Sequence, residues 1–213
     1  MKTITRLALA WALAVWHLCA GAQSIPLALE AYGQGQFETA RAILNYGQSM
    51  GWKSAPVVKS LLFRPDGSPA SEARQKEALA KLLAEADKGN PASQYALGFM
   101  DRYGVGVANK DGGAAFAWFS KSAAKGNAAA QHNLSELYLE GRAVARDDAL
   151  ALYWMTKAAE QGYASSQVNL GYRYLDGRGV AVDEAQALAW FKKAADQGSA
   201  MGLEALGWAY RNG

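Results

Sequence analysis

The sequence offers few side chains for acid–base, nucleophilic or metal chemistry. Its 213 residues include two histidines, His17 and His132, and a single cysteine, Cys19. Zinc sites and cysteine–histidine nucleophiles need several such groups close together. We therefore predict no metal site, no cofactor and no catalytic residue. We expect His132 to be a surface residue, at a position where the sequence varies between Tyr95, Val168 and Glu204.

One enzyme-like motif is present. Ser122-Ala123-Ala124-Lys125 has the Ser-x-x-Lys spacing of penicillin-recognising enzymes, in which the serine is the nucleophile. The Lys-Thr-Gly motif that accompanies it does not occur in the chain. Ser122 also occupies a position that alanine fills elsewhere (Ala158 and Ala194). The pattern favours a packing role for Ser122, and a cell-wall or β-lactam hydrolase is the alternative.

Two further patterns resemble ligand sites. Asp147 and Asp148 could pair their carboxylates on a metal ion, and the Gly104–Gly106 and Gly177–Gly179 segments resemble phosphate loops. No strand precedes either glycine segment, as a phosphate loop would require. An aspartate just before a helix commonly caps it, and a second one suits the helix dipole. We interpret these residues as helix caps and connections between helices.

A period of 36 residues organises these positions. Trp118, Trp154 and Trp190 are 36 residues apart, and their neighbours recur at fixed offsets. The recurring neighbours are an aspartate seven residues before (Asp111, Asp147, Asp183), a lysine three after (Lys121, Lys157, Lys193) and a glycine eight after (Gly126, Gly162, Gly198). Repeats of this length are typical of solenoids, whose units stack to bury a continuous core. We predict that the tryptophans belong to that core.

Each unit contains two amphipathic helices, as its clearest copy shows. Gln167, Leu170, Gly171 and Tyr174 lie on one face of a first helix. Glycines 177 and 179 end that helix, and Asp183 begins a second one with Gln186 three residues later, which is a capping-box pattern. The sequence therefore predicts an all-α fold, a right-handed superhelical α-solenoid of about eleven helices in antiparallel pairs.

The recurring pattern Ala-Gln-x-x-Leu-Gly-x-x-Tyr-x-x-Gly-x-Gly-Val, followed by Asp, Trp, Lys-Ala-Ala and Gly, resembles the Sel-one-like repeat. That family is a subclass of tetratricopeptide-like helical repeats. Three copies are expected over residues 90–126, 127–162 and 163–198, with a half repeat over 199–213. Residues 23–89 are interpreted as degenerate helical hairpins that extend the stack, including a long helix over about 69–88.

Residues 1–22 have the pattern of a secretory signal peptide. Lys2 and Arg6 precede an apolar run of about 12 residues, and Ala20-Gly21-Ala22 offers a cleavage site. Such a run is too short to span a membrane. Cleavage after Ala22 would leave 20 basic and 19 acidic residues, a balance that does not favour nucleic-acid binding. We expect a periplasmic or secreted protein without a membrane span.

Functional residues should lie where the repeats differ, because recurring residues serve every unit alike. In tetratricopeptide-like stacks the first helices line the concave surface, where exposed aromatic residues are typical of binding anchors. The candidate partner-binding residues are Tyr95, Phe99, His132, Glu136, Tyr172 and Trp208. Packing between neighbouring units is the alternative role for each of them.

The resemblance implies a non-catalytic scaffold or adaptor of the bacterial cell envelope that binds a protein or peptide on its concave face. Besides the scaffold and the hydrolase, a third hypothesis is a carbohydrate-binding helper in exopolysaccharide export. Leu203, Leu206, Trp208 and Tyr210 give the C-terminal helix two apolar stripes. Self-association through that helix is therefore a further hypothesis.

Overall fold

The computed structural model describes residues 71–104 and 110–212, together with the single positions 41, 59, 63 and 68. Every regular element within the two described ranges is an α-helix. The helices are α5 (Glu72–Asp87), α6 (Pro91–Tyr103), α7 (Gly112–Ala124), α8 (Ala128–Glu140), α9 (Asp148–Glu160), α10 (Ala164–Asp176), α11 (Glu184–Asp196) and α12 (Ala200–Asn212). The signal peptide and the hairpins expected before residue 71 lie outside the described residues. Helix α5 begins at Glu72, three residues later than expected.

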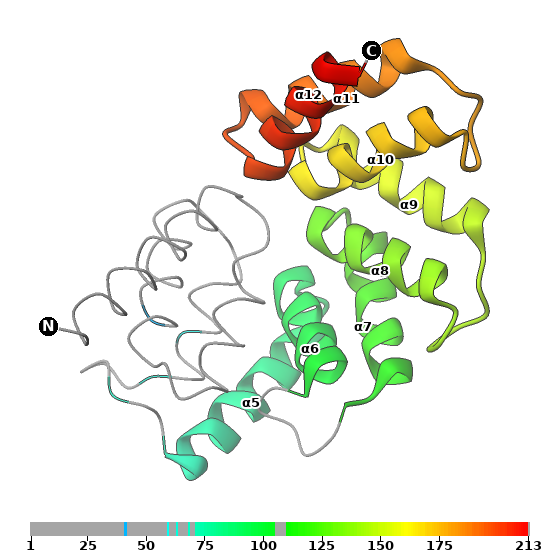
Figure 1. Cartoon of the computed structure of the whole chain (residues 1–213). Helices are drawn as coiled ribbons and strands as arrows, with labels where there is room; N and C mark the ends of the chain where they lie inside the picture. Colours follow the sequence, from blue (N-terminus) through cyan, green and yellow to red (C-terminus); the bar gives the residue numbers. More distant parts are fainter. Residues whose placement is uncertain are drawn as a thin grey trace, which may run out of the picture.

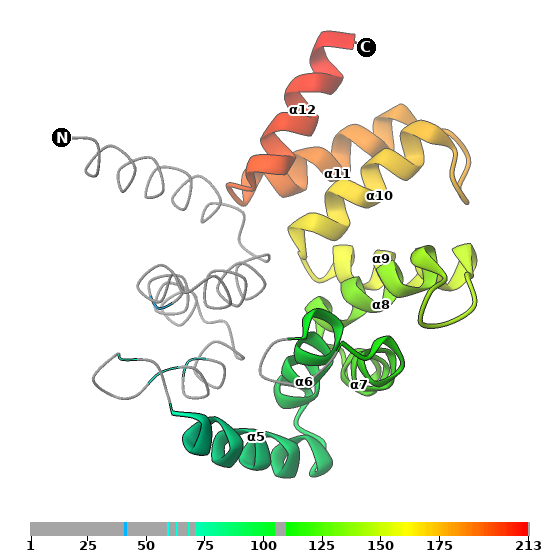
Figure 2. The same ribbon diagram turned by 60° about the horizontal axis from the view of Figure 1, so that its bottom comes forward.

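The helices stack in chain order along an arc (Figure 1). Within a repeat, α6 packs on α7, α8 on α9 and α10 on α11, and each second helix packs on the first helix of the next repeat. The first helices α6, α8, α10 and α12 lie on the inner side of this arc, as a second view also shows (Figure 2). The prediction of an all-α solenoid of helix pairs is confirmed.

Recurring polar residues and glycines fix where the helices begin and end. The side chains of Asp111, Asp147 and Asp183 each accept a hydrogen bond of 2.9 Å from the backbone N–H three residues later, at the start of α7, α9 and α11. The cap predicted for Asp183 is therefore confirmed. The inner helices α6, α8 and α10 each end at a glycine with positive φ, namely Gly104 at 73°, Gly141 at 65° and Gly177 at 68°. Most side chains avoid this conformation, whereas glycine adopts it readily.

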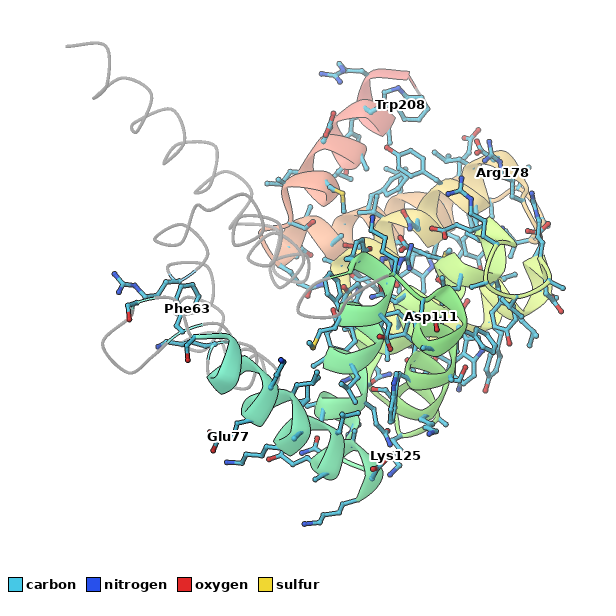
Figure 3. All side chains as sticks on the ribbon, turned by 90° about the horizontal axis from the view of Figure 1, so that it is seen from below. Phe63, Glu77, Asp111, Lys125, Arg178 and Trp208 are labelled. Carbon is cyan, nitrogen blue, oxygen red and sulfur yellow. The ribbon has the colours of Figure 1, made fainter. Side chains whose placement is uncertain are left out.

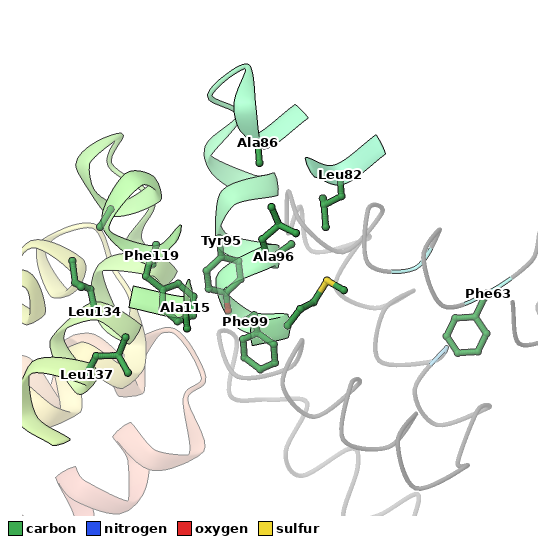
Figure 4. Close-up of a cluster of buried hydrophobic side chains, with 14 residues drawn as sticks. Phe63, Leu82, Ala86, Tyr95, Ala96, Phe99, Ala115, Phe119, Leu134 and Leu137 are labelled. Carbon is green, nitrogen blue, oxygen red and sulfur yellow. The ribbon is translucent and has the colours of Figure 1, made fainter. Parts of the chain in front are cut away.

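The largest fully buried side chain of each second helix is the one that follows the tryptophan. Phe119, Met155 and Phe191 are completely buried, and Phe119 lies among the buried side chains of the largest cluster (Figure 4). The prediction that the tryptophans belong to the core is confirmed in part: Trp118, Trp154 and Trp190 pack against the buried clusters but are themselves only partly buried. Their rings lie at the edge of the core. A lysine Nζ lies 4.3 Å from the ring centroid of Trp118 and another 3.8 Å from that of Trp190.

A recurring glutamine ties each of the inner helices α6, α8 and α10 to the helix that precedes it. The Nε2 atoms of Gln94, Gln131 and Gln167 donate hydrogen bonds of 2.9, 3.2 and 3.1 Å to the carbonyls of Ala86, Ala123 and Ala159. These three glutamines are buried, so their amides are held at a fixed register. These repeated hydrogen bonds therefore fix the positions of the inner helices relative to the helices that precede them.

Candidate functional site: the inner face of the arc

Two of the candidate residues on α6 are packing residues rather than surface anchors. Tyr95 and Phe99 are 3% and 1% exposed and belong to the main hydrophobic cluster (Figure 4). The ring centroid of Tyr95 lies 5.9 Å from that of Phe119. Burial raises the pKa of the Tyr95 hydroxyl well above its ordinary value. The prediction that Tyr95 and Phe99 contact a partner is therefore wrong. These two residues have the alternative role, which is packing between units.

His132 is a residue of α8 that is buried where α8 meets α10. The expectation that it lies on the surface is therefore wrong. Its Nδ1 lies 2.9 Å from the Ser166 hydroxyl, and its Nε2 lies 3.2 Å from the Glu136 carboxylate. The ring also packs on Tyr163 at 4.8 Å between centroids. A buried imidazole needs hydrogen-bond partners on both nitrogens, and residues of two adjacent repeats supply them. His132 therefore joins repeats and is not presented to a ligand.

Glu136 belongs to an ion-pair network that connects α6 to α8. Its Oε2 lies 3.1 Å from the Arg102 guanidinium, which also contacts Glu140 Oε1 at 2.6 Å. Burial alone would raise the pKa of the Glu136 carboxyl, but hydrogen bonding and charge from His132 and Arg102 outweigh it and hold that pKa below its ordinary value. The Glu136 side chain remains one-third exposed. It therefore faces both the network and solvent.

Tyr172 and Trp208 are exposed, as a partner-binding role would require. Their side chains are 39% and 45% exposed, on α10 and α12. Tyr172 is supported by an edge contact with Phe191, at 5.0 Å between ring centroids, and Figure 3 shows Trp208 near the end of α12. The structure thus separates the six candidates into three buried residues and three that reach the surface of the inner helices.

Three residues of this face were not among the candidates from the sequence. Arg102 and Tyr103 end α6, and Glu140 ends α8, one helical turn beyond the predicted positions. Tyr103 is 40% exposed and stacks on Phe99 at 4.3 Å between centroids. Extending the Tyr95–Phe99 stripe by four residues would have identified Tyr103, since residues four apart share a helix face.

The residues with enzyme-like or metal-like spacing have structural partners. Ser122 is fully buried and its hydroxyl donates a 2.6 Å hydrogen bond to the Pro91 carbonyl, while Lys125 Nζ donates to the Gly89 carbonyl. A nucleophile needs an activating base and access to substrate, and Ser122 has neither in this arrangement. Asp147 caps α9 and Asp148 pairs with Arg146 at 3.1 Å. No group of three or more His, Cys, Asp or Glu side chains among the described residues could hold a metal ion.

Comparison with known proteins identifies the repeat. The model of the Sel1 repeat matches residues 91–127, 128–163 and 164–199, which together make up more than half of the 213 residues. No protein of curated function matches the sequence. None of the described helices is long and apolar enough to cross a membrane.

Two solved structures are similar to this chain in both fold and sequence. A Sel1 repeat protein from Oxalobacter formigenes is 31% identical, with a TM-score of 0.61 over 66% of this chain and 56% of that protein. The second is c5321, described as a protective antigen present in uropathogenic Escherichia coli strains and displaying an SLR fold. It is 25% identical, with a TM-score of 0.61 over 88% of this chain and 40% of its own. This chain therefore spans about half the length of these two proteins.

Proposed function

Because this chain belongs to the Sel1 repeat family, whose members are generally protein-interaction scaffolds, we propose that it is a non-catalytic scaffold of the bacterial cell envelope. In this proposal its partner is a protein or peptide bound on the inner face of the arc. The observation that carries the proposal is the exposed aromatic and charged surface of α6, α8 and α10. That surface comprises Tyr103, Glu136, Glu140 and Tyr172.

The support beneath this surface suits a binding role. Phe99 lies under Tyr103, and Phe191 lies against Tyr172, so both exposed rings rest on completely buried aromatic side chains. Rings held in this way lose little conformational entropy when they contact a partner. Aromatic side chains are also enriched at protein interfaces and among the residues that contribute most to binding.

Site-specific crosslinking tests the location of the partner surface. The photoreactive substitution Tyr172→benzoylphenylalanine should capture a partner in envelope extracts. The same substitution at Tyr153 is the matched control, because Tyr153 is an exposed aromatic residue on the second helix α9. Crosslinks that form only from Tyr153 would show that the partner binds the opposite face.

The envelope location rests on the signal-peptide pattern of residues 1–22 and needs its own test. We expect the expressed protein in the periplasmic or secreted fraction, with an N-terminus at or near Gln23. Cell fractionation followed by N-terminal sequencing checks this. A protein that retains Met1 and stays in the cytoplasm would contradict the envelope role and leave the scaffold function unaffected.

Self-association through α12 is a second proposal, which the exposure of its side chains favours. Leu203, Trp208 and Tyr210 are 57%, 45% and 72% exposed. Apolar side chains on one exposed helix are typical of contact surfaces. The substitutions Leu203→Ser and Tyr210→Ser should weaken self-association in sedimentation measurements and leave the melting temperature nearly unchanged. A monomeric wild-type protein at high concentration would contradict this proposal.

A further inference from the structure

The end of α6 and the end of α8 together form a small cation-binding arrangement. The Arg102 guanidinium lies between the carboxylates of Glu136 and Glu140, at 3.1 and 2.6 Å. Its other amino group lies 3.4 Å from the Asn133 carbonyl and from the Asn133 amide oxygen. The guanidinium carbon also lies 5.4 Å from the centroid of the Tyr103 ring. A guanidinium of the chain itself thus shows which chemistry this part of the inner face recognises.

Around the Arg102 guanidinium, carboxylates outnumber arginine side chains. Two carboxylates face one guanidinium, and the Arg102 side chain is only 13% exposed while that of Glu140 is 40% exposed. Both oxygens of Glu136 are engaged, one by Arg102 and one by His132. Glu140 is engaged through Oε1, and its Oε2 has no partner among the described residues. Glu140 Oε2 is therefore an exposed acceptor next to the exposed ring of Tyr103.

The exposed parts of the Tyr103 ring and of the Glu140 carboxylate are the groups that face a second cation. Aromatic rings attract cations, and a carboxylate accepts charge-assisted hydrogen bonds, which are stronger than neutral ones. Tyr103 is held by its stacking on Phe99. The two groups are thus presented in a fixed position.

An apolar contact lies one repeat further along the face. Tyr172 occupies on α10 the position that Glu136 occupies on α8, and α8 adjoins α10 directly through the His132–Ser166 hydrogen bond of 2.9 Å. The exposed Tyr172 ring thus lies on the inner helix next to the one that carries Glu140.

We propose that this face binds a peptide segment of a partner protein in which an arginine or lysine side chain lies between Tyr103 and Glu140 and a neighbouring apolar side chain packs on Tyr172. This inference rests on the proposed scaffold function and specifies the chemical class of its partner. The surplus carboxylate is complementary to a basic segment and repels an acidic one.

Selection of peptides from a random nonapeptide library displayed on phage, with the full-length protein immobilised, tests the inference. We expect enrichment of peptides that carry arginine or lysine next to an apolar residue. A synthetic peptide of the enriched sequence should bind about tenfold more weakly to Glu140→Gln, which corresponds to 1.4 kcal/mol. Tyr103→Ala should also weaken its binding, and added salt should reduce its affinity for the wild type.

Matched controls are available on the second helices. Glu160→Gln and Tyr153→Ala change an exposed carboxylate and an exposed aromatic residue of α9, and they should leave peptide affinity unchanged. Charge reversal by Glu140→Arg should shift the selection towards acidic peptides. Circular dichroism and thermal melting establish that each variant is folded.

The outcomes separate the two levels of the proposal. Failure to select any peptide, peptides without basic enrichment, or basic peptides whose affinity is unaffected by Glu140→Gln would overturn the partner class. The crosslinking test at Tyr172 then decides the scaffold function separately. Binding of an uncharged oligosaccharide at Tyr103 and Tyr172 instead would overturn both.

Discussion

At the scale of single residues, one hydrogen-bond ladder is complete in two repeats and incomplete in the third. The Nε2 atoms of Gln161 and Gln197 donate hydrogen bonds of 2.7 Å to the side-chain oxygens of Gln131 and Gln167. Lys125 occupies the equivalent position in the first described repeat. The buried Oε1 of Gln94 consequently has no partner. A buried acceptor without a hydrogen bond costs about 1–3 kcal/mol.

Lys125→Gln should therefore stabilise the protein by about 0.5–1.5 kcal/mol, the usual net contribution of one hydrogen bond. The new amide can reach Gln94 as Gln161 reaches Gln131, while the exposed contact from Lys125 to the Gly89 carbonyl is lost. Chemical denaturation measures the change. The reverse substitution Gln161→Lys should destabilise by a similar amount, and changes of the same sign in the two variants would contradict the ladder as the cause.

Glu136 predicts how the stack responds to acid. Its folded-state pKa lies below the ordinary value of 4.5, so the unfolded state binds more protons than the folded state at low pH. The stabilisation from this carboxylate is present above the unfolded pKa and is lost as the pH falls through the folded pKa. Between pH 7 and pH 3.5, the urea midpoint should therefore fall less in Glu136→Gln than in the wild type. Glu160→Gln, which changes an exposed carboxylate, is the control. If the urea midpoint fell equally in Glu136→Gln and Glu160→Gln, the role of Glu136 would be contradicted.

At the scale of helices, the contact between the two helices of a repeat depends on a matched pair of side chains. A Cβ atom on Gly98 would lie 2.8 Å from the Phe119 ring, and one on Gly171 would clash with the Phe191 ring. The middle repeat has Ser135 in place of the glycine and Met155 in place of the phenylalanine. The flexible methionine leaves room for the larger residue on α8, so packing constrains the two positions jointly.

A double-mutant cycle tests this coupling. Gly171→Ser should cost about 1–3 kcal/mol, because overpacking forces the Phe191 ring to move. In combination with Phe191→Met, which reproduces the middle repeat, the total loss should be smaller than the sum of the two single losses. The measurement is the interaction free energy from denaturation of all four proteins. A strictly additive result would show that the two positions pack independently.

At the scale of the whole molecule, the array behaves as a one-dimensional stack in which each repeat contacts its neighbours. Loss of packing in the middle repeat removes support from the repeats on both sides. The buried residue that provides this support is Met155, since Trp154 beside it is only partly covered. The same relation holds for Phe191 and Trp190 in the following repeat.

Met155→Ala should cost about 2–5 kcal/mol and lower the melting temperature of the whole stack. Trp154→Ala should cost less than the roughly 3–5 kcal/mol usual for a fully buried tryptophan, because part of its ring already contacts solvent. Calorimetry compares the two variants. A larger loss from Trp154→Ala than from Met155→Ala would show that the tryptophan carries more of the core packing than its exposure indicates.

The sequence by itself determined the architecture. Several local signals recur in every repeat: the cap at Asp183, the helix-ending Gly177 and the apolar positions of α10 and α11. Each acts through hydrogen bonds or backbone conformations within a few residues. Because the same signals occur in successive repeats, each copy supports the interpretation of the others. The all-α stack could therefore be predicted without any knowledge of tertiary contacts.

Only the tertiary structure decided which side chains reach the surface. His132 and Tyr172 both lie on inner helices, yet His132 is buried because Ser166 and Tyr163 of the next repeat lie against it. Similarly, periodicity could not rank Trp190 against Phe191, since adjacent positions differ in burial only through the neighbouring helix. The Arg102–Glu140 contact joins residues 38 positions apart. A pair at that separation is fixed by how two repeats pack, and a local pattern carries no information about it.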